Sequence, residues 1–349
     1  MRALVVSTLS PDLSGCGIAD VPDPVATPGQ LLVRVHAASL NFPDLLMTRG
    51  AYQLKPPLPF IPGMEMAGEV VTAPADSGFT IGDRVVCGTR LGAFAELVAC
   101  DADAARTMPD HLDYVVAASV GTAYLTAYVS LVRLGALQPG EWVLVHGATG
   151  GVGLAAVDLA KALGARVIAT SRSVEKLEQV AANYHVDATL TVPGFRTQVK
   201  ELTGGGADVI YDPVGGDVFD ESTRCIAFGG RLLVVGFASG RIAEIATNIP
   251  LIKGFSVVGV RAGEYGRQFP ARGRENLDAI WRLASERRIR PRVDRRFALE
   301  DWRAAFDAMQ ASDMVGKLVI GALFPLIVRN WISRLPGVVP NHRAHVFTS

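Results

Sequence analysis

The stretch 142–172 constrains the fold of this chain more than any other part of the sequence. An apolar run at 142–145 is typical of a strand that is buried on both faces, and a glycine-rich turn follows at 147–153. Beyond the turn, apolar residues recur at helical spacing over 154–163, and a second apolar run begins at Val167. Strand, turn, helix and strand in this order predict one βαβ unit of a parallel sheet.

The glycine turn itself is suited to a dinucleotide. It resembles the pattern Gly-x-Gly-x-x-Gly, with Ala148, Gly150 and Gly153 at the spaced positions and Gly147 just before them. Such glycines let the backbone approach a pyrophosphate, and the following helix offers free N–H groups at its N-terminus. Glycine there also suits tight packing alone, but the complete unit favours a nucleotide site. We expect contacts to the cofactor from Ala148, Thr149, Gly150, Gly151 and Val152.

Length and composition indicate a globular chain with two cores. The 349 residues are 49% apolar and 19% charged, which excludes a disordered protein. Lysine and arginine together number 34, as do aspartate and glutamate, so net charge suggests no bulk attraction to nucleic acid. Four scattered cysteines predict reduced thiols and a cytoplasmic location. No apolar run reaches about 18 residues, so we expect no membrane span.

The order of elements predicts an α/β fold with two domains. Residues 1–119 contain short strands broken by Gly and Pro, which favours a barrel-like β domain. Over 120–260 strands and helices alternate, which predicts an inserted, doubly wound sheet of six strands. Residues 261–349 return to the first domain, with 322–349 as a surface extension. Six arginines over 287–296 suit a phosphate-bearing substrate tail or nucleic acid, but we favour a solvated surface.

Several motifs together resemble one family. The β-rich part carries Asn-Phe-Pro-Asp at 41–44, Pro-Gly-Met-Glu at 62–65 and Gly-Asp-Arg-Val at 82–85. Gly-Thr-Ala-Tyr at 121–124 precedes the glycine turn, and Gly-Lys-Leu-Val at 316–319 closes the pattern. The chain resembles the medium-chain dehydrogenase/reductase superfamily and is most similar to the quinone oxidoreductases related to zeta-crystallin. This resemblance covers all but the C-terminal tail and implies a GroES-like catalytic domain with an inserted Rossmann domain.

The zinc ligands of related dehydrogenases are missing at the matching positions. The resemblance places Asn41 and Thr122 at or near cysteine positions of the zinc-dependent relatives, and Met64 at a histidine position. An amide, a thioether and a hydroxyl make a poor Zn²⁺ site. Of the four cysteines that hold a structural zinc in those relatives, only Cys87 and Cys100 stand in this region. We therefore expect no metal, which favours hydride transfer to an acceptor that is already electron-poor.

The resemblance implies an NADPH-dependent, zinc-free reductase of quinones. One alternative is a 2-enoyl reductase that acts on acyl thioesters or enones, and the sequence does not separate these two. A third hypothesis is an NADPH-binding protein with a structural or RNA-contacting role. We also expect a homodimer joined through the cofactor domains, because the edge strand at 255–260 is too apolar to remain unpaired in water.

Three residues are candidates for the substrate end of the site. The resemblance places Asn41 and Asp44 there, and an Asn amide can donate to an acceptor oxygen as negative charge develops. Tyr52 would either donate to the same oxygen or form a wall of the pocket. Asn and Asp also favour turns on their own account, which we prefer for Asp44, and Tyr52 is equally suited to packing.

The other end of the site is predicted to select NADPH. NAD-specific folds carry an acidic residue about 20 positions after the glycine turn, and no carboxylate stands there in this chain. Ser171, Arg172 and Lys176 can instead donate hydrogen bonds to a 2′-phosphate. Further cofactor contacts are expected from turns at the edge of the sheet and from positions that the resemblance implies: Thr126, Val214, Gly236, Phe237 and Lys317.

Overall fold

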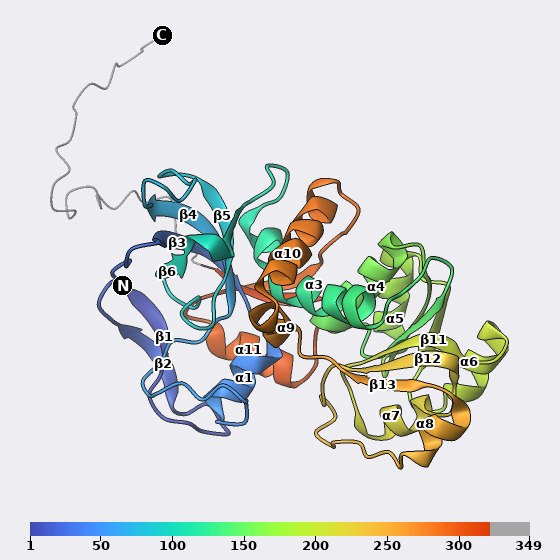
Figure 1. Ribbon diagram of the computed structural model, residues 1–349. Coiled ribbons are helices and arrows are strands. Elements are labelled where there is room, and N and C mark those ends of the chain that lie inside the picture. The colour runs from blue at the N-terminus through green and yellow to red at the C-terminus, as the bar shows by residue number, and fades with distance from the viewer. Residues whose placement is uncertain (322–349) are drawn as a thin grey trace, which may run out of the picture.

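A computed structural model describes residues 1–321, which form two lobes side by side (Figure 1). The first lobe is rich in β structure, and the second is a parallel sheet covered by helices. The α/β fold with two lobes that the sequence predicts is therefore confirmed. No helix within residues 1–321 is long and apolar enough to cross a membrane. The predicted surface extension at 322–349 lies outside the described residues.

The first lobe is built on a seven-stranded sheet in the order β14-β15-β3-β4-β5-β7, with β6 paired to β3. Burial alternates along β3, as expected for a strand with one face toward the core. The hairpin β1 (Arg2–Val6) and β2 (Cys16–Asp20) lies beside this sheet. The sheet strands are β3 (Gln30–Ser39), β4 (Glu65–Thr72), β5 (Arg84–Gly88), β6 (Leu97–Asp101), β7 (Ala105–Thr107), β14 (Val293–Ala298) and β15 (Lys317–Gly321).

The second lobe is a six-stranded parallel sheet in the order β10-β9-β8-β11-β12-β13, as predicted. Every residue of β8 is buried, because helices cover both faces of the sheet. The chain reverses its winding between β8 and β11, which is where open sheets of this kind bind ligands. The strands are β8 (Trp142–Val145), β9 (Arg166–Ser171), β10 (Ala188–Thr191), β11 (Ala207–Asp212), β12 (Ile226–Val234) and β13 (Ser256–Gly259).

The helices follow the predicted alternation, and α4 ends before Gly164, which has the left-handed φ of +82° that favours glycine after a helix. A 3₁₀ turn spans Ala102–Ala104, and a π-helical segment, Val129–Leu134, extends α3. The helices are α1 (Phe42–Thr48), α2 (Tyr114–Ala118), α3 (Gly121–Tyr128), α4 (Gly151–Ala162), α5 (Val174–Tyr184), α6 (Arg196–Thr203), α7 (Gly216–Ser222), α8 (Asn248–Lys253), α9 (Ala262–Gln268), α10 (Pro270–Ser285) and α11 (Trp302–Gln310).

Two boundaries differ clearly from the sequence prediction. The apolar sequence at 93–98 predicts a strand, but β6 begins at Leu97, because Ala93 and Phe94 donate to a loop and Ala95 makes only an isolated bridge to β1. There Ala93 donates to the Gly63 carbonyl and Phe94 to that of Pro62. The sequence over 218–226 predicts a helix, but α7 ends at Ser222, and Ile226 opens β12 by pairing with β11.

The two lobes contact each other where the glycine turn lies against Gly316, just before β15 returns the chain to the first lobe. The Gly316 N–H donates to the Thr149 carbonyl across 2.9 Å, and Gly150 and Gly316 form an isolated parallel bridge. Strands β14 and β15 then join the sheet of the first lobe. The contact places the start of β15 directly against the predicted cofactor turn.

Candidate functional site

The glycine turn leaves no room for side chains at two positions. A Cβ added at Gly153 would lie 2.1 Å from the Gly147 carbonyl oxygen, so the turn folds back tightly onto the first turn of α4. A Cβ at Gly151 would lie 2.6 Å from Cδ of Lys317. At the start of the turn, Ala148 is fully buried and donates from its N–H to the Thr170 carbonyl. The turn therefore holds the N-terminus of α4 in the geometry that suits a pyrophosphate.

The corner between β9 and α5 lies beside the turn. The hydroxyl oxygens of Thr149 and Ser171 are 3.3 Å apart, and Ser171 is the last residue of β9. Ser173 caps α5, because its hydroxyl accepts a hydrogen bond from the Lys176 N–H across 3.2 Å. Arg172 is exposed at this corner. The backbone of Ser171, Arg172 and Lys176 thus forms one corner at the end of the glycine turn.

A buried ion pair lies at the other side of the turn. The Lys317 ammonium donates to Oδ1 of Asn41 across 2.6 Å and to Oε1 of Glu65 across 3.2 Å. It also donates to the Leu40 carbonyl. The side chains of Lys317 and Glu65 are only 7% and 3% exposed. The predicted cofactor residue Lys317 is thus enclosed by three oxygen atoms of the first lobe.

Glu65 and Asn41 complete this buried centre. The second carboxylate oxygen of Glu65 accepts from the Thr122 N–H at the start of α3, across 2.6 Å. The Asn41 amide donates to Glu65 and to the Ser39 carbonyl. Both N–H groups of the Asn41 side-chain amide are therefore used within the protein. Donation to a substrate would have to replace one of these two hydrogen bonds. Sequence reasoning missed Glu65, although a carboxylate inside an apolar strand, as in β4, signals a buried partner of opposite charge.

Asp44 makes the turn contacts that its residue type favours, and Tyr52 makes packing contacts. The Asp44 carboxylate is fully buried and accepts from the backbone N–H groups of Asn41 and Gly63, which fixes the start of α1. Burial raises the pKa of Asp44 to about 7, against the effect of these N–H donors. Tyr52 is half-buried and packs with a small cluster that includes Met64. A direct role of either residue in catalysis remains a prediction.

Two turns at the carboxyl edge of the sheet carry the other predicted cofactor residues. Oδ1 of Asp212, at the end of β11, accepts from the N–H groups of Val214 and Gly215. Gly236 approaches the Pro213 carbonyl, and the Phe237 side chain is 41% exposed. Burial raises the pKa of Asp212, whose Oδ2 has no hydrogen-bond partner among the described residues. Thr126 lies apart on α3, where its hydroxyl donates to the Thr122 carbonyl.

The residues present do not suit zinc. The Asn41 amide oxygen accepts a hydrogen bond from Lys317, Met64 packs in an apolar cluster, and Thr122 donates its backbone N–H to Glu65. Across residues 1–321, no three His, Cys, Asp or Glu side chains gather in a group that could hold a metal ion. Cys87 and Cys100 are buried free thiols, and their mutual contact together with burial raises the pKa of Cys87.

Comparison with known proteins identifies the family. Residues 27–110 match the alcohol dehydrogenase GroES-like domain, and residues 151–281 match the zinc-binding dehydrogenase family. The chain is 40% identical to a quinone oxidoreductase-like protein 2 homolog of Nematostella vectensis over 83% of this chain and 81% of the relative. It belongs to the quinone oxidoreductase branch of the medium-chain dehydrogenase/reductase superfamily. The predicted family and oxidoreductase class are therefore confirmed.

A solved structure and a larger enzyme extend this comparison. The quinone oxidoreductase of Thermus thermophilus, solved also in complex with NADPH, superposes with a TM-score of 0.82 and 33% identity. The alignment covers 92% of this chain and all of that one. This member of the quinone oxidoreductase branch is also 36% identical, over 83% of its length, to a segment of a phenolphthiocerol/phthiocerol polyketide synthase of Mycobacterium tuberculosis. That segment is 13% of the synthase chain.

Proposed function

We propose that this protein is an NADPH-dependent reductase of quinones or similar electron-poor acceptors and that it works without zinc. The observation that carries the proposal is the glycine turn with its adjoining corner of hydrogen-bond donors. In that corner Ser171 ends β9 and Arg172 is exposed, while the carboxylate of Glu175 already accepts a hydrogen bond from Ser173. The solved relative in complex with NADPH supports the same cofactor.

The residues of the chain would hold the cofactor at its pyrophosphate and at its 2′-phosphate. Backbone N–H groups of Gly151 and Val152 at the start of α4 suit the pyrophosphate, whereas the Gly150 N–H already donates to the Gly147 carbonyl and Gly150 contributes only a close backbone approach. Ser171, Arg172 and Lys176 suit the 2′-phosphate, where the planar guanidinium of Arg172 offers two parallel donors. When bound, the nicotinamide supplies the hydride.

At the acceptor end the protein contributes shape and polar contacts rather than a metal. Asn41 and Tyr52 remain candidates to orient the acceptor oxygen, and Phe237 and Val214 to border the nicotinamide. Quinones already attract a hydride without a Lewis acid, so the absence of zinc ligands at Asn41, Met64 and Thr122 is consistent with this chemistry. Metal analysis of the dialysed protein tests this part, and about one zinc per chain would contradict it.

The cofactor assignment is tested with Arg172→Ala. A hydrogen bond to a charged group contributes roughly 1.5–3 kcal/mol, so we expect the Kd for NADPH to rise roughly 10- to 150-fold. The Kd for NADH, which lacks the phosphate, should scarcely change. Arg196→Ala, which removes an exposed arginine of α6, is the control and should leave both constants unchanged. Equal losses for both cofactors, or a parent protein that prefers NADH, would refute the assignment.

A second candidate is 2-enoyl reduction of acyl thioesters or enones, favoured by the similarity to a segment of a polyketide synthase. The arginine-rich stretch gives this candidate little support. Arg288, Arg292 and Arg295 donate to protein oxygens, and the Arg290 guanidinium lies over the Tyr184 ring. NADPH oxidation with matched quinones, enones and enoyl-CoAs decides between the candidates, and a faster reaction with enoyl-CoA would overturn the quinone assignment.

We further propose a cytoplasmic homodimer joined at β13. This strand ends the order of the parallel sheet, and exposed apolar side chains lie on it and on the neighbouring segments. Phe228 is 88% exposed, Leu251 81% and Ile252 73%. Such a surface at a sheet edge favours pairing with a second copy. Light scattering at micromolar concentration tests the proposal, and a monomer would contradict it.

A further inference from the structure

Lys176, one of the proposed 2′-phosphate donors, already has partners in the first lobe. Its ammonium donates to the Ser312 carbonyl across 2.8 Å and lies 3.7 Å from Oδ1 of Asp313. The Lys176 side chain is 25% exposed and that of Asp313 is 66% exposed. The contact joins the first turn of α5 to the turn that follows α11, so it spans the two lobes.

The turn at Ser312 and Asp313 is fixed by its own backbone. Helix α11 ends at Gln310, and Ser312 adopts a left-handed φ of +53°. The Ser312 N–H then donates to the Met309 carbonyl, and the Asp313 N–H donates to that of Ala308 across 2.9 Å. These two reverse bonds are those of a Schellman motif. They determine where the Ser312 carbonyl and the Asp313 side chain lie relative to Lys176.

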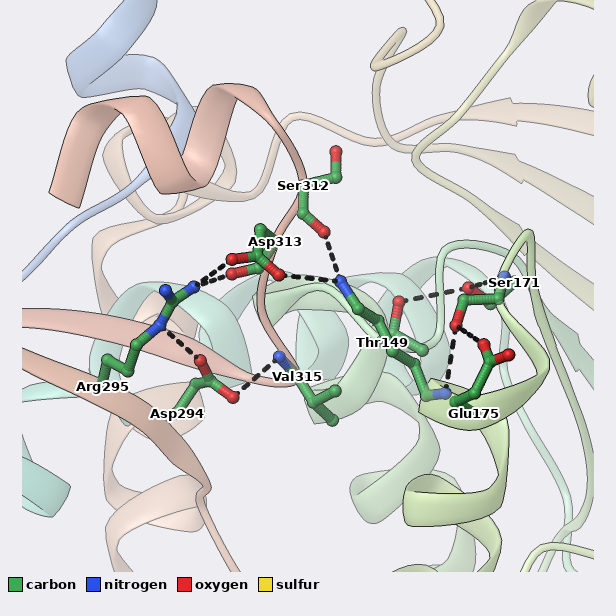
Figure 2. A network of polar contacts seen from close by, with 10 residues as sticks. Thr149, Ser171, Glu175, Asp294, Arg295, Ser312, Asp313 and Val315 are labelled. Carbon is green, nitrogen blue, oxygen red and sulfur yellow. Dashed lines mark hydrogen bonds and ion pairs between the residues drawn. The ribbon is translucent and has the colours of Figure 1, made fainter. Parts of the chain in front are cut away.

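The Asp313 carboxylate is also anchored from the opposite side. Arg295 donates to its Oδ2 across 3.1 Å and to its backbone carbonyl. The same guanidinium donates to Asp294 across 2.9 Å, and Asp294 in turn accepts from the Val315 N–H (Figure 2). Asp313 is therefore a negative charge that Arg295 positions beside the ammonium of Lys176.

We propose that Asp313 and the Ser312 carbonyl compete with the 2′-phosphate of the cofactor for the Lys176 ammonium. Asp313 is thus a specificity-determining residue that acts through Lys176 and reduces the preference for NADPH over NADH. The inference rests on the proposed phosphate site at Ser171, Arg172 and Lys176. A phosphate that draws Lys176 toward itself weakens the link between α5 and the end of α11, and it also approaches the like charge of Asp313.

The expected effect follows from the exposure of the pair. Exposed ion pairs contribute about 0.2–1 kcal/mol, which corresponds to roughly 1.5- to 5-fold in a dissociation constant. Asp313→Asn removes the charge and keeps the backbone bonds of the turn, so the fold is retained. We therefore expect this variant to bind NADPH more tightly by roughly that factor and to bind NADH unchanged.

The experiment measures dissociation constants for NADPH, NADH and 2′,5′-ADP, since the last probe carries the 2′-phosphate without the nicotinamide. The variants are Asp313→Asn, Lys176→Met and the double variant. Asp307→Asn removes a comparably exposed carboxylate, which is ion-paired with Arg303 on α11, and serves as the matched control. We expect tighter NADPH and 2′,5′-ADP binding only in Asp313→Asn, and no gain from this change when Lys176 is already Met.

Other outcomes overturn the inference in distinguishable ways. Weaker NADPH binding in Asp313→Asn would mean that Asp313 positions Lys176 for the phosphate instead of competing with it. An equal gain in the Lys176→Met background, or in Asp307→Asn, would indicate only a long-range charge effect. A parent protein that does not prefer NADPH would refute the proposed cofactor site itself. A parent that prefers NADPH while Asp313→Asn behaves identically would refute this inference alone.

Discussion

Two lysine–carboxylate pairs lie on either side of the glycine turn, and their surroundings are opposite: Lys317 pairs within the first lobe, whereas Lys176 pairs across the two lobes. Lys317 and Glu65 are 7% and 3% exposed, whereas Lys176 and Asp313 are 25% and 66% exposed. The enclosed ammonium has three oxygen partners within 3.2 Å, and no solvent competes for them. The exposed ammonium has one close partner and one carboxylate at 3.7 Å. A lysine and a carboxylate therefore make a fixed structural contact at Lys317 and an exchangeable contact at Lys176.

The two ion pairs differ in what each charge can contact once the pair is broken. Breaking a buried pair leaves a charge without water or a partner, which is strongly unfavourable. Breaking an exposed pair returns both charges to water, and salt screens what remains. Only the exposed contact can therefore give its lysine to a ligand at small cost, which is why we assign phosphate binding to Lys176 and a positioning role to Lys317.

The largest expected effect tests this contrast with the same substitution at both lysines. Lys317→Met should destabilise the protein by roughly 3–5 kcal/mol, because Glu65 is left buried without a counter-charge. Lys176→Met should cost no more than about 1 kcal/mol. Urea unfolding measures both. Adding Glu65→Gln to Lys317→Met should recover part of the loss, and similar losses for the two single variants would end the comparison.

A second prediction extends the contrast between enclosed and exposed groups to histidine. His146 lies fully buried just before the glycine turn, with its ring nitrogens 2.8 Å from the hydroxyl oxygens of Thr170 and Ser222. Burial lowers the pKa of His146 to about 3. The unfolded chain therefore takes up the proton first as the pH falls, and stability present above about pH 6.5 is lost below it.

The size of this loss follows from the two pKa values. Between about pH 7.5 and about pH 5, His146 should remove about 2 kcal/mol from the free energy of unfolding. Urea unfolding of the parent and of His146→Gln at both pH values measures this contribution as the difference between the two proteins, because the buried Asp44 carboxyl, with its pKa raised to about 7, changes the stability in the opposite sense over the same range. His111→Gln changes an exposed histidine and should leave the pH dependence as it is in the parent. The same pH dependence in His146→Gln and in the parent would show that His146 does not cause the loss.

The smallest expected effect concerns the turn at Ser312, whose carbonyl accepts from Lys176. Ser312 has a left-handed φ of +53° at the position where helices most often place glycine. Ser312→Gly should therefore stabilise the protein by about 0.5–1 kcal/mol, while Ala308→Gly within α11 should destabilise it by a similar amount. Thermal unfolding of the two variants measures the difference. A loss of stability in Ser312→Gly would mean that the serine side chain itself holds the turn.

Local patterns were enough to predict the fold. The glycine turn, the alternation of strands and helices and the glycine after α4 all carry their signal within a short window of sequence. The strand expected at 93–98 was wrong in its start, because residues 93 and 94 bond to the distant loop at Pro62 and Gly63. The helix expected over 218–226 was too long, because pairing with β11 draws Ile226 into a strand.

The site was harder to predict, because its key contacts join residues far apart in the chain. Glu65 and Lys317 are separated by 252 positions, and Lys176 and Ser312 by 136. Donor types near the glycine turn predict which residues suit a phosphate, but not which of them already have a partner. The same holds for the arginine-rich stretch, where several side chains contact the second lobe. Arg288 donates to the Ala162 carbonyl, and Arg292 donates to Gln179 of α5.

The connection from Asp313 to Lys317 contacts three parts of the site, which are the Lys176 corner, the glycine turn and the buried centre. Asp313 lies beside Lys176, the Val315 N–H bonds to Asp294, and the Gly316 N–H bonds to the glycine turn. Lys317 then enters the buried centre. Local opening of a protein proceeds in contiguous cooperative units, and this connection is too short to open in parts. The amide protons of Val315 and Gly316 should therefore exchange with solvent together, and their common exchange rate reports on the whole junction between the lobes.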